Sequence, residues 1–359
     1  MHGGQSEVSR IPVRSRRLLM VGNYLSAWGG SRCVCEDLSE RLADRGWTVI
    51  TTSARPGRLA RLVDMTWVAW SCRAEYGVAQ VDVYSGASFV WAEWVSGWLR
   101  LLGKKVILTL HGGNLPEFAK RWPRRVGRLL RQADRVTAPS EYLRRALRSW
   151  RPDIELMPNP IDFDRYSFRL RDKPKPNLVW LRALHRIYNP VLAVEVVAAV
   201  RRSFPDIRLA LYGPDKRDGV LGDLEERIRG FGLADKVRWY GGVQKSEVAK
   251  VLSESDVFLN TTDVDNTPVS VIEAMACGLC VVSTNVGGVP DLVRDGQDGL
   301  LVGPRDPGGM AAAVTRVLEN PGLSALLSGN AHRRVAGYDW GSVLPEWEKL
   351  VTDVEREAV

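Results

Sequence analysis

The sequence predicts an α/β protein made of two doubly wound parallel sheets. Its 359 residues are more than one hydrophobic core usually fills. Apolar segments of strand length alternate with helical patterns along the chain, as they do where helices join parallel strands. The Lys/Pro-rich segment "RDKPKPN" (171–177) interrupts this alternation, which then restarts. We therefore expect a linker there and two domains, residues 1–165 and 166–335.

The first half begins with a unit of strand, loop, helix and strand. An apolar strand ends at Gly22, a loop contains Gly29 and Gly30, and a helix runs to Arg45, after which Gly46 turns the chain into "WTVITTS". This order is typical of parallel strands. Shorter strands are predicted at "VDVYS", "KVILTLHGG" and "DRVTAPS", with helical patterns between them, until the chain reaches "ELMPNPIDF".

The second half repeats the same order. Strands are predicted at "LVWL", "IRLALYG", "KVRWYGG" and "DVFLN", and helices at 190–203, 221–231 and 245–254. Both halves are thus expected to be Rossmann-like, with the carboxyl ends of their strands around a shared cleft. Ligands of such sheets bind beyond those ends, so the residues that follow each strand are the candidates for a site.

The positive charge is concentrated in the first half of the chain. The net charge is +8, and residues 1–165 hold 26 Lys/Arg against 16 Asp/Glu, whereas residues 166–359 hold 24 against 26. A basic half indicates an anionic neighbour, and a nucleic acid, a membrane surface and a phosphorylated substrate all qualify. No recognition motif for nucleic acid interrupts the two sheets, so we expect no nucleic-acid partner.

The chain is expected to be cytoplasmic and free of structural metal. Its first residues lack the apolar region of a signal peptide, and no stretch reaches the roughly 18 apolar residues of a spanning helix. The five cysteines lie in patterns typical of small buried residues. A zinc site would need "CVC" (33–35) and "CGLC" (277–280) together, and because these lie on a predicted helix and a helix-to-strand turn we assign no metal.

The stretch "DNTPVSVIEAMACG" (265–278) predicts a helix with an anion site at its beginning. Thr267 is expected to cap the helix, Pro268 suits its first position, and Gly278 is expected to close it, which gives a helix over 268–277. The free N–H groups of Val269 and Ser270, together with the helix dipole, favour a phosphate.

Two carboxylates flank this helix beginning. Asp265 lies just outside it, and Glu273 lies five residues inside, about 7.5 Å along the axis. That spacing fits the reach from a diphosphate to a ribose, so one acid would accept from sugar hydroxyls and the other from ribose hydroxyls. The alternative is that Asp265 is a turn residue and Glu273 a solvated helix position.

In its motifs and their order the chain resembles the GT-B glycosyltransferases of family four (glycosyl transferases group 1). The stretch 265–278 is similar to that family's donor-binding motif, in which two acids are separated by seven residues. The other matching segments follow in the family's order: "WGGSR", "LTLHGG", "TAPSEYLRRAL", "MPNPIDFDRY" and the final "YDWGSVLPEWEKLV". The resemblance implies an acceptor-binding domain (1–165), a nucleotide-sugar-binding domain (166–335) and a C-terminal helix (336–359) that crosses back to the first.

The resemblance also implies a reaction and a set of site residues. The reaction is transfer of a sugar, with retention at the anomeric carbon, from a UDP- or GDP-linked donor to a saccharide or lipid-linked acceptor in surface glycan biosynthesis. It would need no metal and no cofactor. The implied catalytic residues are His111, Arg182 and Asp265. The implied donor-binding residues are Gly29, Gly30, Arg186, Val243, Thr267, Pro268, Val269, Ser270 and Glu273.

The chain departs from the family pattern in the loop "LVWLRALHRIYNP" (178–190). Arg182 fits the family's diphosphate-binding arginine, but Leu181 replaces a glycine and Ile187 stands where a lysine is usual. Arg186 either supplies the missing charge or is a solvated loop residue, and the sequence leaves both open. The first acid is also shorter than usual, since Asp265 stands in place of glutamate.

Aromatic and basic residues of the first half suggest where an acceptor would dock. The segment "KRWPRRVGRLLRQ" (120–132) is strongly basic, and Trp91, Trp94 and Trp98 lie in the preceding helical pattern. Together they suit an anionic membrane face, which would make the protein peripheral on the inner membrane; the alternative is a solvated helix beside a Trp-rich core. Other functions left open are a catalytically silent nucleotide-sugar-binding relative and a GT-B nucleotide-sugar epimerase or phosphorylase.

Overall fold

The computed structural model describes residues 16–24, 33–55 and 57–357. Gly29 and Gly30, both expected at the donor site, lie outside these residues. By their contacts the described residues form two compact units. The first unit contains the described residues up to Leu110, residues 124–137 and the chain from Leu344 onward, and the second contains residues 111–123 and 138–343.

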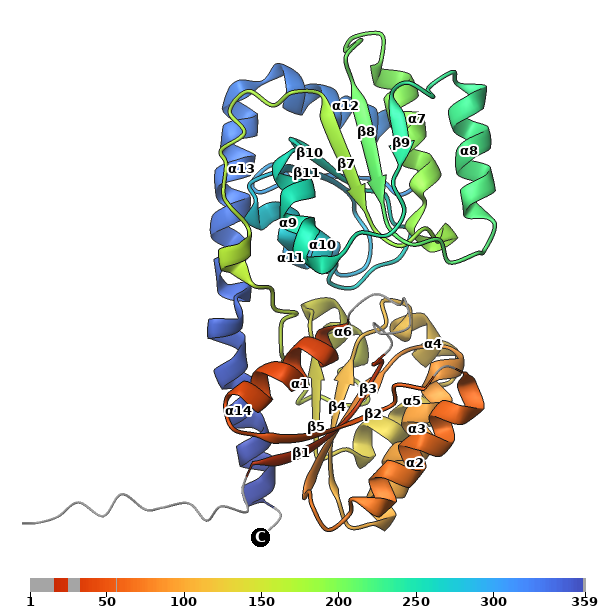
Figure 1. The fold of residues 1–359 in the computed structure, drawn as a ribbon, viewed down its shortest axis with the longest axis vertical. Helices are drawn as coiled ribbons and strands as arrows, with labels where there is room; N and C mark the ends of the chain where they lie inside the picture. The colour runs from red at the N-terminus through yellow and green to blue at the C-terminus, as the bar shows by residue number, and fades with distance from the viewer. Residues whose placement is uncertain (1–15, 25–32, 56, 358–359) are drawn as a thin grey trace, which may run out of the picture. The chain divides into compact units, whose positions relative to one another are not determined.

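The first sheet has six strands in the order β2-β1-β3-β4-β5-β6 (Figure 1). Its strands are β1 (Arg17–Val21), β2 (Thr48–Thr52), β3 (Val78–Val83), β4 (Lys105–Leu110), β5 (Arg135–Ala138) and β6 (Glu155–Leu156). The helices that follow them are α1 (Val34–Asp44), α2 (Arg58–Ser71), α3 (Ala87–Leu101), α4 (Leu115–Arg121), α5 (Pro123–Gln132) and α6 (Glu141–Leu147). The pairs β1·β2, β1·β3, β3·β4 and β4·β5 are parallel, as the helical crossovers predicted.

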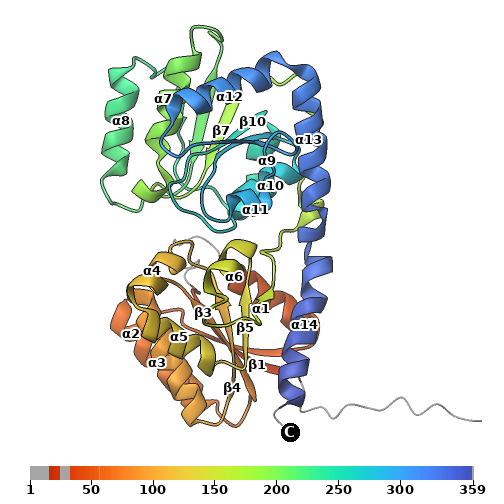
Figure 2. The same cartoon turned by 180° about the vertical axis from the view of Figure 1, so that it is seen from behind.

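The second sheet also has six strands, in the order β12-β11-β10-β7-β8-β9. Figure 2 shows this sheet between its flanking helices. They are β7 (Asn177–Leu181), β8 (Arg208–Tyr212), β9 (Val237–Trp239), β10 (Val257–Asn260), β11 (Cys280–Thr284) and β12 (Leu300–Val302). The helices are α7 (Pro190–Val200), α8 (Val220–Gly230), α9 (Lys245–Ser253), α10 (Val269–Ala276), α11 (Val289–Leu292), α12 (Pro307–Glu319), α13 (Pro321–Val335) and α14 (Trp340–Arg356). The predicted fold class of two doubly wound parallel sheets is confirmed.

Each face of the second sheet is covered by its own hydrophobic core. Along β7, Leu178 and Trp180 join the core that contains α7, α8 and α12, whereas Val179 and Leu181 join the core that contains α9, α10 and α11. Successive side chains of a strand point to opposite faces, so a strand covered on both faces must be apolar throughout. This is why the strands of this half appear as short apolar runs.

The cysteines follow the expected burial only in part. None of the five, all of which the structure describes, forms a disulfide, and Cys35, Cys277 and Cys280 are buried whereas Cys33 and Cys72 are half-buried. Within the described part of the chain, no helix is both long enough and apolar enough to cross a membrane.

Candidate active site

Helix α10 begins at Pro268 without a side-chain cap. The N-cap residue is Pro268, whose side chain makes no capping hydrogen bond. The predicted cap at Thr267 is wrong, because its hydroxyl donates instead to the Pro139 carbonyl at 3.2 Å. The first-turn donors at Val269 and Ser270 therefore receive no cap from Thr267 or Pro268. The hydroxyl oxygen of Ser270 is buried and has no partner among the described residues.

The other end of α10 closes as predicted. Gly278 has φ +74°, a left-handed conformation that favours glycine. Its N–H donates to Met275 O at 3.0 Å, and the Leu279 N–H donates to Ala274 O at 3.0 Å. These two bonds form a Schellman motif, which satisfies the last carbonyl groups and turns the chain directly into β11.

An ion pair between Arg182 and Asp265 lies beyond the strand ends of the second sheet. Arg182 follows β7, and its Nη2 is 2.6 Å from Asp265 Oδ2. The guanidinium also lies 4.5 Å from the centroid of the Tyr188 ring. Burial disfavours the charged guanidinium, but the Asp265 carboxylate and Tyr188 outweigh this and raise the pKa of Arg182 above its ordinary value. Its Nε is buried and has no partner within the described structure, so one donor is unused.

Asp265 is held in place by backbone packing. Its Oδ1 accepts from the Asn266 N–H at 2.9 Å. A Cβ added to Gly287 would lie 1.9 Å from Asp265 O, and one added to Gly113 would lie 2.8 Å from the Asp265 carbonyl carbon. Only glycine leaves room for the Asp265 backbone at both positions. His111, half-buried at the end of β4, lies two residues before Gly113 in the same unit.

Glu273 is buried inside the second unit. Only 5% of it is exposed, and its Oε1 accepts from the Tyr166 hydroxyl at 2.7 Å. Burial, together with the Glu273 carboxylate, raises the pKa of Tyr166, which keeps that hydroxyl a donor. The alternative of a solvated helix position for Glu273 is therefore wrong. No role was assigned from the sequence to Tyr166 or Tyr188, although Tyr166 ends the segment 157–166 and Tyr188 lies in the loop 178–190, both of which were compared with the family.

Arg186 and Val243 are placed differently from Arg182. The Arg186 N–H donates to Asp218 Oδ2 at 2.7 Å, and its exposed guanidinium pairs with Asp223 of α8 at 3.0 Å. Of the two alternatives for Arg186, this geometry favours the solvated one. Val243, after β9, is half-buried against the core that contains α9 and α10.

The loop after β7 is tied to the end of β10. The Ile187 carbonyl accepts from the Asp263 N–H at 2.8 Å, and the Thr261 hydroxyl donates to Tyr188 O at 2.8 Å. Asp263 itself pairs with Arg305 at 2.9 Å. Among residues 16–24, 33–55 and 57–357, no three His, Cys, Asp or Glu side chains are grouped so that they could hold a metal ion.

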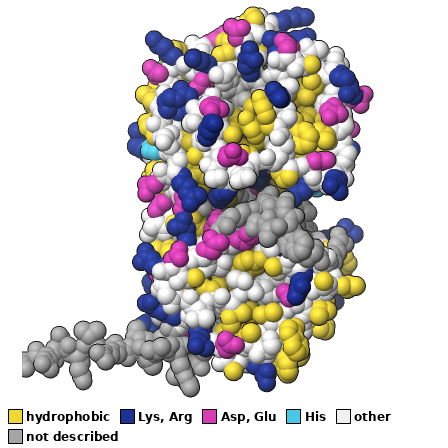
Figure 3. Space-filling view, in the orientation of Figure 1, with side chains coloured by type: hydrophobic (Ala, Val, Ile, Leu, Met, Phe, Trp, Pro, Cys, Tyr) yellow, Lys and Arg dark blue, Asp and Glu magenta, His cyan; other side chains and the backbone are white. Residues whose placement is uncertain are grey.

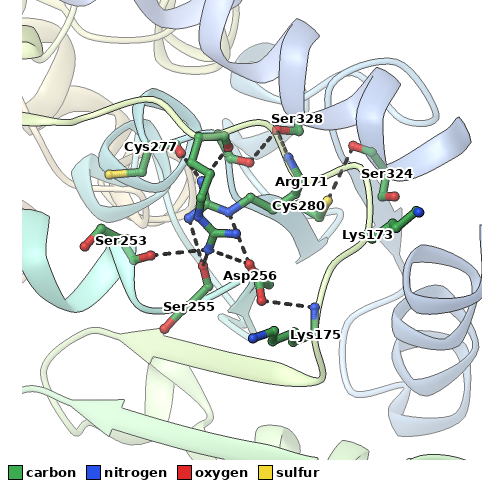
Figure 4. A network of polar contacts seen from close by, with 12 residues as sticks. Arg171, Lys173, Lys175, Ser253, Ser255, Asp256, Cys277, Cys280, Ser324 and Ser328 are labelled. Atoms are coloured by element: carbon green, nitrogen blue, oxygen red, sulfur yellow. Dashed lines mark hydrogen bonds and ion pairs between the residues drawn. The ribbon is translucent and has the colours of Figure 1, made fainter. Parts of the chain in front are cut away.

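The C-terminal end of α10 is anchored by Arg171, as Figure 4 shows. This arginine is 1% exposed, and it donates to the carbonyls of Cys277 and Ser255, the latter at 2.8 Å. Its Nε lies 3.3 Å from Asp256 Oδ1. A cation beside the last carbonyls of a helix is stabilised by the helix dipole.

The segment 171–177, predicted as a linker, is therefore docked on the second unit. Besides the side-chain contacts of Arg171, its N–H donates to Ser328 Oγ at 3.1 Å, and the Ser328 hydroxyl donates to Gly278 O at 2.6 Å. The Lys175 N–H donates to Asp256 Oδ2 at 3.0 Å. The Lys/Pro composition suggested a solvated linker, but these backbone and arginine contacts decide its position (Figure 4).

The fold defines the class of protein. The two six-stranded parallel sheets with their flanking helices match GT-B glycosyltransferases. Sucrose-phosphate synthase from Thermosynechococcus elongatus has a TM-score of 0.77 at 18% identity, over 95% of this chain and 100% of that one. HepE of Anabaena, solved with UDP and glucose, has a TM-score of 0.74 at 17% identity, over 94% of this chain and 100% of that one.

The sequence then identifies the family. Residues 28–165 match the family described as Glycosyltransferase Family 4, and residues 175–320 match that described as Glycosyl transferases group 1. The two ranges together take in most of the chain, which therefore belongs to the family-four glycosyltransferases, as its motifs predicted.

Two curated relatives illustrate the range of the family. The GDP-mannose-dependent alpha-(1-6)-phosphatidylinositol monomannoside mannosyltransferase of Mycolicibacterium smegmatis is 27% identical over 269 residues, which are 68% of this chain and 67% of that one. Glycogen synthase of Mycobacterium tuberculosis is 27% identical over 195 residues, which are 53% of this chain and 46% of that one. The chain thus spans less than half the length of several curated relatives that it matches.

Replacing Arg171 by leucine should destabilise the second unit. The substitution leaves the buried Asp256 without this cation, and breaking such a pair costs about 3–5 kcal/mol. Urea unfolding followed by circular dichroism should show a lower midpoint, and hydrogen exchange of the α10 amides should be faster. The matched control is Lys173→Leu at an exposed position, which should stay within about 0.5 kcal/mol of the original protein. Equal midpoints for the two variants would contradict the anchoring role.

Proposed function

We propose that this protein is a retaining glycosyltransferase that moves a sugar from a nucleotide diphosphate sugar to a saccharide or lipid-linked acceptor. The observation that carries the proposal is the pairing of Arg182 with Asp265 in the same unit as the uncapped beginning of α10, with Glu273 buried inside that helix. A guanidinium and free helix N–H groups suit a diphosphate, and two carboxylates suit hydroxyl groups.

Each expected residue receives a role in this proposal. Arg182 and the N–H groups of Val269 and Ser270 stabilise the charge that grows on the diphosphate as it leaves. Glu273, oriented by Tyr166, accepts from the ribose hydroxyls, and Asp265 accepts from hydroxyls of the transferred sugar. His111 forms a hydrogen bond with that sugar. The backbone at Gly29 and Gly30 approaches the phosphates, and the backbone of Val243 contacts the base. Thr267 and Pro268 shape the beginning of the helix.

The unused donors of the site support the phosphate assignment. Arg182 Nε and Ser270 Oγ are both buried, and neither has a partner in the part of the chain that the structure describes. A buried polar group without a partner costs free energy, so a ligand that satisfies it gains that energy on binding. Phosphate oxygens would accept from both groups.

The relatives support the donor and acceptor classes. HepE was solved with UDP and glucose, and the Mycolicibacterium relative is described as GDP-mannose-dependent and acts on a phosphatidylinositol mannoside. We therefore propose a UDP- or GDP-linked donor and an acceptor that is a saccharide or is lipid-linked, in surface glycan synthesis. A lipid-linked acceptor would place the protein in the cytoplasm, docked on the inner membrane face.

A catalytically silent nucleotide-sugar-binding protein is the second candidate. It is favoured by Arg186, which pairs with Asp223 of α8 instead of joining Arg182, and by Ile187 at the position of the usual lysine. Release of UDP or GDP in the presence and absence of acceptor separates the candidates. A transferase releases the nucleotide only with acceptor, an epimerase converts the donor without net release, and a silent relative binds the donor unchanged.

Replacing Arg182 by alanine should lower turnover by roughly two orders of magnitude or more, since removing one preorganised donor to a developing charge costs about 2.7–4 kcal/mol. The matched control is Arg186→Ala, which removes an exposed arginine of the same loop and should cost less. Nucleotide release with a verified donor measures both. Unchanged rates in a folded Arg182→Ala variant would remove Arg182 from the chemistry, whereas no nucleotide release by the original protein would favour the silent relative.

Replacing Glu273 by alanine should weaken donor binding, because each lost hydrogen bond to a charged group contributes roughly 1.5–3 kcal/mol. Tyr166→Phe should weaken it less, since the carboxylate stays and only its orientation is relaxed. Calorimetric titration with the donor measures both effects, and circular dichroism checks the fold. Donor affinity equal to that of the original protein in Glu273→Ala would show that this carboxylate does not touch the ribose.

Activity should survive chelation by EDTA, because Arg182 and the α10 N–H groups are proposed to supply the positive charge that a metal would otherwise bring. The measurement is nucleotide release before and after EDTA treatment. Loss of activity that magnesium or manganese restores would overturn metal independence and would make Asp263 and Asp265 the first ligands to test.

A further inference from the structure

Helix α2 turns an apolar stripe toward solvent. Leu59, Val63, Trp67 and Trp70 are 80%, 68%, 62% and 41% exposed, respectively. Their spacing of four, four and three residues places them on one side of the helix. A surface helix normally turns its apolar side to the core, so this arrangement requires an explanation beyond folding.

Helix α3 carries a second exposed apolar stripe next to the first. Val90, Trp94 and Leu101 are 47%, 55% and 81% exposed. Trp94 Nε1 donates to Thr66 Oγ1 of α2 at 3.1 Å, so the two helices are neighbours. An open groove of about 570 Å³ runs between them, lined by Leu62, Val63, Thr66, Trp67, Trp70, Trp94 and Trp98. Figure 3 shows hydrophobic side chains gathered over this part of the first unit.

These positions test one of the two alternatives for the tryptophans of α3, a Trp-rich core. Trp94 is exposed, and Trp98 lines the open groove, so neither belongs to a closed Trp-rich core. Trp91 differs, since it is half-buried and the guanidinium of the buried Arg61 lies 5.0 Å from its ring centroid. The surface therefore consists of the exposed stripes of α2 and α3, which we call the tryptophan surface.

A row of arginines borders the tryptophan surface. Helix α5 lies beside α3, because Arg125 Nε donates to Glu93 Oε1 at 3.1 Å and Arg100 Nη1 donates to Gln132 O at 3.1 Å. Helix α5 contains no acidic residue. Its exposed arginines, at positions spaced by four and three residues, are Arg124, Arg128 and Arg131. On the α2 side, the guanidinium of Arg73 lies 4.7 Å from the centroid of the Trp70 ring.

We infer that the tryptophan surface and the arginine row of α5 dock the first unit on an anionic lipid bilayer. Tryptophan rings settle at the level of the headgroups, where one end of the ring is in contact with acyl chains and the other with water. Arginines beside them pair with anionic headgroups. Membrane docking extends the lipid-linked acceptor proposed above, but vesicle binding can be measured without any sugar nucleotide, so either proposal can fail alone.

The charge distribution favours a bilayer over a second copy of the chain. In a two-fold dimer the same surface meets itself, so a positive border would face a positive border with no acidic residue of α5 to compensate. A negatively charged bilayer instead offers both an apolar interior for the tryptophans and compensating charge for the arginines.

Flotation of the full chain with vesicles tests this inference. The protein should float with vesicles of phosphatidylcholine and phosphatidylglycerol in equal parts, bind less in high salt, and bind weakly to phosphatidylcholine alone. The double variant Trp67→Ser/Trp94→Ser should lose roughly tenfold in partitioning, since it removes exposed apolar area that the bilayer would bury. The triple variant Arg124→Gln/Arg128→Gln/Arg131→Gln should lose on the order of a hundredfold, at about fivefold for each basic residue.

Matched variants elsewhere show whether the effect belongs to this surface. Leu326→Ser, at another exposed apolar position, and the triple variant Arg202→Gln/Arg229→Gln/Arg316→Gln, at exposed arginines of the second unit, should bind vesicles like the original protein. Wild-type protein that does not float with anionic vesicles would overturn the inference, and so would equal losses in the control variants. A dimer that Trp67→Ser/Trp94→Ser dissociates in the ultracentrifuge, without vesicle binding, would assign the surface to a second copy instead.

Discussion

The fixed position of helix α10 is the constraint on which the candidate site depends. Its C-terminal end is tied down by the buried Arg171, which bonds the Cys277 carbonyl and pairs with Asp256. Its N-terminal end has no side-chain cap. A helix held at one end and uncapped at the other presents its N–H groups and the positive end of its dipole in a fixed direction. Glu273, buried one turn further along, is fixed by the same anchoring.

Electrostatics support a diphosphate as the proposed ligand of this site. Arg182 is charged and paired with Asp265, yet one of its buried nitrogen atoms has no partner among the described residues. An unpaired Asp265 carboxylate would repel a phosphate. In the ion pair the charge of Arg182 neutralises that carboxylate, and the guanidinium keeps a donor available. A bound diphosphate would place its negative charge beside this pair and the positive end of the α10 dipole. Its hydrogen bonds there would be strong, because hydrogen bonds to charged groups are stronger than neutral ones.

Local signals in the sequence were sufficient to predict the elements and part of the site. Pro268 and Gly278 fixed the limits of α10 to within a residue, because a proline before the first turn and a left-handed glycine after the last are local requirements. That Arg182 and Asp265 belong to one site followed only from a family resemblance, and their direct ion pair was not predicted, since they lie 83 positions apart in the sequence. Whether any of the site residues binds the donor stays a prediction.

Contacts between distant segments could not be predicted. Tyr166 is 107 residues from Glu273, and nothing around it in the sequence marks it as the partner of a carboxylate. Arg171 lies in a Lys/Pro-rich segment whose composition predicts solvation, yet its side chain is buried. Only part of the tryptophan surface could be predicted from the sequence, because a helical pattern that contains tryptophans does not show which side of the helix packs on the sheet.

Calorimetric titration with nucleotides tests the central claim most directly, which is that Arg182 and the beginning of α10 hold a diphosphate. The account predicts saturable binding of one molecule of UDP or GDP per chain, with the corresponding monophosphate bound much more weakly, because it lacks the second phosphate that these groups would contact. Equal affinity for the monophosphate and the diphosphate, or no binding of either nucleotide, would contradict it.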